Sequence, residues 1–172
     1  MSKASLISLG GMAAVLAGIL RGIASFLPGT TPDAALQLLY ILTDVCILLG
    51  VFALYGIRYK ETGKLGFLGF LTAVVGILVI RSSKAITGAD LYPAGSLLFS
   101  LGLILLGMRL WLAHVLPIWV VGLWSLSVLV GIIGYFIPSL DLLFVVAGLM
   151  FAIGFAGAGM KLRSLTELAK DD

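Results

Sequence analysis

The chain has 172 residues, of which 61% are hydrophobic and only 11% carry a charged side chain. Soluble domains carry about 25% charged residues, so this composition excludes a water-solvated globule and indicates a surface covered by lipid. The net charge of +3 does not indicate nucleic-acid binding, because the basic residues fall at the ends of apolar segments, where membrane topology places them.

Six apolar segments follow one another, each long enough to cross a bilayer as a helix. A closed barrel is the other permitted spanning form, but runs such as residues 94–106 lack its alternation of apolar and polar positions. We therefore predict an all-α bundle of six transmembrane helices, forming a single transmembrane domain over residues 1–172 with no separate soluble module. In chain order, the predicted helices cover residues 6–27, 34–57, 65–80, 92–112, 117–137 and 140–160.

The first predicted helix is followed by Pro28-Gly29 and Pro32. Its apolar run is too long for a cleavable signal peptide, so we expect it to remain as an uncleaved anchor. The third predicted helix is the shortest, and charged residues flank it on both sides. The segment after residue 160 mixes both signs of charge and is predicted to be a short solvated helix end.

Small residues recur every four positions on two of the predicted helices. The first helix carries them at Gly10, Ala14, Gly18 and Gly22, and the sixth carries them at Gly148, Ala152 and Ala156. In lipid, small residues let helix backbones approach closely and drive much of their association. We predict close helix contacts on these two faces, either within one chain or between subunits.

The basic residues are distributed unevenly between the two predicted sides of the membrane. One side collects Lys3, Arg58, Lys60, Lys64, Arg109, Lys161, Arg163 and Lys170. The other side collects Arg21, Arg81 and Lys84, together with the acidic Asp33, Asp90 and Asp141. Lysine and arginine concentrate on the cytoplasmic side, so both termini are predicted to be cytoplasmic. The short loops and the lack of a predicted extramembrane domain suggest the plasma membrane of a prokaryote.

The second, fourth and sixth predicted helices end alike. Their closing residues are Gly56-Ile57-Arg58, Gly107-Met108-Arg109 and Gly159-Met160-Lys161. This spacing suggests three copies of a helical hairpin related by an axis along the membrane normal. The alternative is that glycine is abundant and that topology alone places a basic residue after each even-numbered helix.

Asp44 is the one acidic residue predicted near the bilayer centre. An ionised aspartate there costs at least about 2.5 kcal/mol, so it must be protonated, paired or hydrated. Arg21 and Arg81 lie above it by predicted depth and could reach down to pair with it. Hydroxyl groups offer neutral hydrogen bonds instead, at Thr43, Thr72, Ser96, Ser100, Ser125 and Ser127. The site is a proton or cation site, a structural clasp, or a polar contact with another subunit.

No residue cluster indicates catalysis, a cofactor or a metal. The single cysteine, Cys46, cannot form an internal disulfide or a redox pair. The single histidine, His114, cannot supply both axial ligands of a haem, although it could give one ligand to a pigment or metal. No nucleophile with a base in reach and no cluster of metal ligands is present, so we expect no enzyme activity.

Two functional hypotheses remain. The first is a non-catalytic scaffold or accessory subunit whose helices pack against partner helices or against another copy of itself. The second is a small transporter or channel that uses Asp44 as a buried proton or cation site, with Arg21 or Arg81 as counter-charge. In either case the partners include membrane lipids, whose anionic head groups Lys161 and Arg163 could touch, and exclude nucleic acid. Short loops and abundant glycine are typical of small polytopic proteins of bacteria and archaea.

Overall fold

The computed structural model describes residues 3–27, 34–89, 91–140 and 142–168. Within these ranges the chain is all-helical, which confirms the predicted bundle of six helices. The helices are α1 (Lys3–Ala24), α2 (Ala34–Ile57), α3 (Tyr59–Thr87), α4 (Tyr92–Leu112), α5 (Ile118–Phe136) and α6 (Leu142–Leu168), with a short 3₁₀ turn η1 (Pro138–Leu140) before α6.

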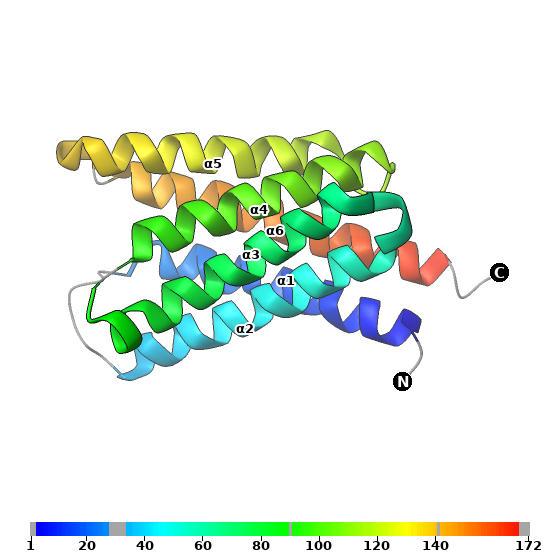
Figure 1. Cartoon of the computed structure of the whole chain (residues 1–172), viewed down its shortest axis with the longest axis horizontal. Coiled ribbons are helices and arrows are strands. Elements are labelled where there is room, and N and C mark those ends of the chain that lie inside the picture. The colour runs from blue at the N-terminus through cyan, green and yellow to red at the C-terminus, as the bar shows by residue number, and fades with distance from the viewer. Residues whose placement is uncertain (1–2, 28–33, 90, 141, 169–172) are drawn as a thin grey trace.

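The helices run along the long axis of the molecule (Figure 1), and their contacts join them into a ring. Each helix contacts its neighbours in the chain, and α6 packs extensively against α1 to complete the ring. The start of α1 and the end of α6 lie at the same end of the bundle, together with the α2–α3 and α4–α5 connections (Figure 1). This end is called the terminal end below, and the other is called the opposite end.

All six helices are long and apolar enough to cross a membrane. Between 28% and 44% of the residues in each span are buried inside the bundle, and much of the remaining surface is apolar. Large aliphatic side chains are exposed on every helix, such as Leu38, Leu126 and Met160. A surface of this kind is stable in hydrocarbon and not in water, so the structure is that of a membrane-embedded protein.

Aromatic side chains fill the centre of the bundle. Phe151 and Phe155 stack at a centroid distance of 5.4 Å on α6, and the Phe99 ring from α4 lies 5.8 Å from that of Phe151. Trp124 from α5 lies 6.0 Å from Phe155 and is buried, with no hydrogen-bond partner for its Nε1. Phe155 also packs against Gly50 on α2. These rings join α2, α4, α5 and α6 around one packed core.

The α2–α3 connection is a tight turn with a glycine break. Tyr59 begins a single helical turn that ends at Gly63, where φ is 62° and ψ is −163°. This conformation is essentially restricted to glycine, because a Cβ would clash there. Arg109 on α4 donates a hydrogen bond of 3.1 Å from Nε to the Thr62 carbonyl, which the break removes from the helical pattern.

Two helices extend beyond their predicted ends. The prediction ended the third helix at residue 80, but α3 continues through Arg81 to Thr87. The prediction ended the sixth helix at residue 160, but α6 continues to Leu168 because its last turns are amphipathic. Leu162 and Thr166 are buried there, whereas Arg163 and Glu167 are exposed. A polar residue does not end a helix when the other face of that helix still packs against the bundle.

The predicted close contact of the first and sixth helices lies within this chain. A Cβ at Gly18 would lie 2.6 Å from the Ala152 carbonyl oxygen, and one at Gly159 would lie 2.5 Å from the Gly11 carbonyl oxygen. The small-residue face of α1 is shared, however, because a Cβ at Gly10 would lie 2.8 Å from the Leu49 carbonyl oxygen of α2. The stripe therefore packs against two neighbours and is not left for a partner.

A second small-residue interface joins α3 and α4, and the sequence analysis missed it. It is formed by Gly69, Ala73 and Gly76 on α3 and by Gly95 and Gly102 on α4. Their spacings of three, four and seven residues place them on one face of each helix, whereas the predicted contacts on the first and sixth helices rest on a repeat of four. A repeat of seven, combined with glycine, is the signal that would have found this contact.

The predicted repetition of three hairpins stays a prediction. The three glycines that suggested it have different surroundings: a Cβ at Gly56 would meet nothing within 4 Å, one at Gly107 would meet Trp124, and one at Gly159 would meet α1.

Several residues used in the topology argument lie outside the described residues, namely Pro28, Gly29, Pro32, Asp33, Asp90, Asp141 and Lys170.

Candidate functional site

Asp44 lies inside α2, facing α3. It is about 15 Å from the start of the helix at 1.5 Å per residue. The neighbouring Thr43 and Cys46 are buried, whereas Ile41 and Val45 are exposed at the surface of the bundle. Asp44 thus sits at the boundary between the packed face of α2 and its outward face.

Arg81 pairs with Asp44 across the α2–α3 contact. Its Nε donates a hydrogen bond to Asp44 Oδ2, and the two groups form an ion pair. The Arg81 guanidinium carbon also lies 6.0 Å from the centroid of the Tyr40 ring on α2, a distance at which a cation and an aromatic face attract. Because α3 continues past Arg81, this residue lies about 9 Å inside the helix end and not at it.

Arg21, the second candidate partner, has a longer-range role. It lies in the last turn of α1 and interacts electrostatically with Asp44, without a hydrogen bond or ion pair among the described residues. The structure therefore brings Asp44 and Arg81 into contact and places Arg21 as a more distant positive charge near the same end of the bundle.

The hydroxyl groups considered as alternative partners of Asp44 do not bind it. Thr43, Ser96, Ser125 and Ser127 each donate to a carbonyl three or four residues earlier in their own helix, at 2.7 to 3.0 Å. Such bonds satisfy a hydroxyl locally inside a membrane helix. The ion pair with Arg81 is thus the polar contact that the structure gives the Asp44 carboxylate.

The pair is on the perimeter of the bundle and not at its centre. The Arg81 side chain is 40% exposed and that of Asp44 is 23% exposed. On α2, Gln37 is exposed and Tyr40 is half-buried, at positions that share the face of Asp44. Gln37, Tyr40, Asp44 and Arg81 together form a polar patch on the outward side of α2 and α3, which is called the α2–α3 polar patch below.

His114 ends α4 in a conformation that usually requires glycine. Its φ is 56°, and its N–H donates to the Trp111 carbonyl at 2.9 Å. The Val115 N–H donates to the Leu110 carbonyl at 2.9 Å, and both of these side chains are buried. This is the Schellman pattern of hydrogen bonds, with histidine in the left-handed position that glycine normally takes.

Replacing His114 by glycine is expected to raise the stability of the protein by up to about 1 kcal/mol, because the left-handed conformation costs a residue with a Cβ about 1–2 kcal/mol. Replacement by valine, which is branched at Cβ, is expected to lower it. Thermal unfolding of both variants in detergent measures the difference. A valine variant as stable as the glycine variant would contradict this interpretation of the turn.

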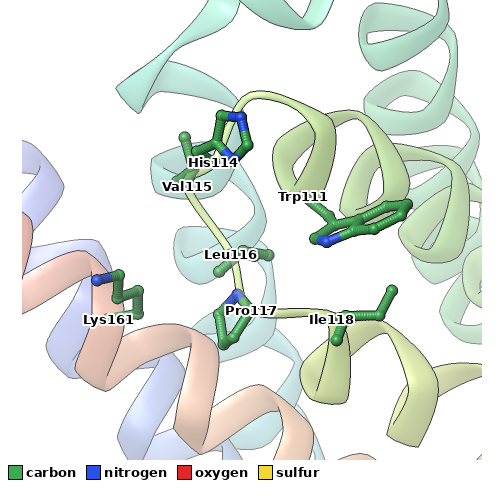
Figure 2. A pocket seen from close by; sticks show the side chains of 7 residues that line it. All are labelled: Trp111, His114, Val115, Leu116, Pro117, Ile118 and Lys161. Atoms are coloured by element: carbon green, nitrogen blue, oxygen red, sulfur yellow. The ribbon is translucent and has the colours of Figure 1, made fainter.

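A shallow hollow lies beside this turn at the terminal end. It has a volume of approximately 360 Å³, and Figure 2 shows the residues that line it. The loop from His114 to Pro117 crosses the view between Lys161 of α6 on one side and Trp111 of α4 on the other (Figure 2). The predicted topology places His114 and Lys161 on the same side of the membrane, but it does not indicate that they line one hollow.

Comparisons of this chain with protein-family models, with curated proteins and with solved structures found no match. Among the described residues, no group of three or more histidine, cysteine, aspartate or glutamate side chains could hold a metal ion.

Proposed function

We propose that this protein is a non-catalytic integral membrane protein that acts as a scaffold or accessory subunit, packing against a helix of another membrane protein. The observation that carries the proposal is the Asp44–Arg81 ion pair on the outward side of α2 and α3. Charged groups are costly where they face hydrocarbon, and polar contacts between helices are one of the forces that join membrane proteins. A partner helix with an amide or hydroxyl side chain would cover the α2–α3 polar patch.

The competing hypothesis of a transporter or channel needs a path through the bundle along which a proton or cation can reach Asp44. Phe99, Phe151 and Phe155 instead fill the centre of the bundle. Asp44 is also already bound to a counter-charge. Packed aromatic side chains and a paired carboxylate favour a structural role over ion conduction through the centre of the helix bundle.

The proposal extends to location and orientation. Four basic residues lie at or near the terminal end of the bundle, namely Arg58, Lys64, Arg109 and Lys161. Positive charge of this kind supports a cytoplasmic position for both termini, and the plasma membrane of a prokaryote is the proposed location.

The decisive experiment is affinity purification from native membranes with a photocrosslinking residue in place of the exposed Leu38, beside the patch. The variant Asp44→Asn with Arg81→Gln removes both charges and leaves neither unpaired. The matched control is Arg58→Gln with Glu61→Gln, which removes an exposed ion pair of 2.8 Å at the terminal end. We expect the crosslinked, stoichiometric partner to fall at least tenfold in the first variant and to be retained in the control.

Two results would overturn the proposal. One is equal recovery of crosslinked partner from the two double variants when both are correctly folded. The other is proton flux into liposomes that contain the purified protein, detected with a pH-sensitive dye and abolished by Asp44→Asn. A crosslink between two copies of this chain would identify the partner as the protein itself.

A further inference from the structure

The hollow at the terminal end combines features that suit an amphiphilic anion. It is lined by Lys161 from α6, by Trp111 at the end of α4, by His114 to Pro117 of the connecting loop, and by Ile118 at the start of α5 (Figure 2). These residues include one cationic side chain and no acidic one. From this arrangement we propose that the hollow binds the phosphate-containing head group of an anionic membrane phospholipid, a role beyond the proposed packing function.

Lys161 supplies the charge. Its ammonium group makes no ion pair within the part of the chain that the structure describes, although Arg58, Arg81 and Arg163 each pair with a carboxylate there. Lys161 is half-buried, and in Figure 2 its side chain lies across the connecting loop from Trp111, with the ammonium at the outer end. An ammonium without an ion-pair partner among the described residues, on a flexible side chain that lines the hollow, is a suitable contact for a phosphate oxygen.

Hydrogen-bond donors surround the same hollow. Both the Trp111 indole and the His114 ring are exposed and can donate from ring N–H groups. The first turn of α5 adds backbone N–H groups, because Pro117 precedes it and no side chain caps it. The positive end of the α5 dipole therefore adds to the attraction that Lys161 exerts.

The apolar residues select a lipid over free phosphate. Val115 and Leu116 are buried below the loop, whereas Trp111 and Ile118 are exposed beside it. Tryptophan is enriched at the level of lipid head groups, where one side of its ring contacts acyl chains. A molecule with a charged head and an apolar body would contact both kinds of lining residue, and inorganic phosphate would contact one kind.

The proposal can be tested with phosphatidylglycerol as the probe. Native mass spectrometry of the full chain in detergent counts the bound phosphatidylglycerol molecules and compares them with phosphatidylcholine. We expect the variant Lys161→Gln to reduce phosphatidylglycerol occupancy at least fivefold. The matched control is Lys64→Gln, which removes the same charge from an exposed residue at the same end of the bundle. Its occupancy is expected to equal that of the wild-type protein.

The remaining outcomes are informative as well. Equal loss in Lys161→Gln and Lys64→Gln would overturn the proposal, because it would indicate general attraction of lipid to a basic surface. Equal occupancy by phosphatidylcholine would also overturn it. Displacement of the lipid by millimolar inorganic phosphate would show a site for free phosphate instead. Thermal unfolding of each variant tests whether the bundle remains folded. The variant Trp111→Leu keeps the charge of Lys161 and is expected to lower phosphatidylglycerol occupancy by a smaller factor than Lys161→Gln.

Discussion

Replacing Gly102 by alanine is expected to destabilise the protein by about 1–3 kcal/mol or more, the range for forcing extra atoms into a packed interior. A Cβ at this position would lie 2.7 Å from the Gly69 carbonyl oxygen and closer still to the Ala73 amide nitrogen. Both neighbours are backbone atoms of α3, which cannot rotate away as a side chain can. The helices would have to move apart, and the loss would extend along the whole α3–α4 interface.

The matched control is Gly122→Ala on α5, where a Cβ would meet nothing within 4 Å. Alanine in a helix interior is favoured over glycine by roughly 0.5–1 kcal/mol, so this variant should unfold at the same or a slightly higher temperature. Thermal unfolding in detergent, followed by intrinsic tryptophan fluorescence, compares the two. Equal melting temperatures would show that the close approach of α3 and α4 does not contribute to stability.

The sequence was sufficient to predict the number and type of the helices because hydrocarbon allows few alternatives. A backbone in lipid must satisfy its own polar groups, so each apolar segment of sufficient length becomes a helix. Helix ends were harder to predict. Arg81 and Lys161 were taken to mark ends, but a helix continues past a basic residue when its side chain is paired or lies at the bundle surface.

The packing was predicted only in part. A spacing of four in α1 and α6 was found, and their contact within the chain agrees with it. Whether such a stripe packs within a chain or between chains depends on which helices are neighbours, and a single sequence does not contain that information. The α3–α4 interface depends on glycines seven residues apart, a spacing that is common by chance in a glycine-rich chain.

The candidate site was also predicted only in part. Asp44 could be recognised from the sequence alone, because a carboxylate in an apolar span is costly. The choice between Arg21 and Arg81 depended on where α3 ends and on which helix lies beside α2, and both facts come from the structure. The hollow beside His114 could not be predicted, because it joins residues of α4, α5 and α6.

Breaking the Asp44–Arg81 pair is expected to have unequal effects depending on which residue is changed. The variant Arg81→Gln leaves a short carboxylate inside α2, where it cannot reach the head-group region. The expected loss of stability is about 2 kcal/mol, below the roughly 2.5–3.5 kcal/mol for a charge at the centre of a membrane helix, because the pair is partly exposed at the bundle surface. The variant Asp44→Asn leaves Arg81, whose long side chain can extend toward the opposite end and its water, so a loss of about 1 kcal/mol is expected.

The double variant Asp44→Asn with Arg81→Gln removes both charges and should be more stable than Arg81→Gln alone. Coupling energies between contacting residues are commonly 0.5–3 kcal/mol, and a value of about 1–2 kcal/mol is expected for this pair. Unfolding in mixed micelles of increasing dodecyl sulfate content gives the free energy of unfolding of the wild-type protein, the two single variants and the double variant. The Arg58→Gln and Glu61→Gln cycle serves as the control, because that pair is exposed at the terminal end and should couple by less than about 1 kcal/mol. Additive losses for Asp44 and Arg81 would show that their contact does not hold α2 and α3 together.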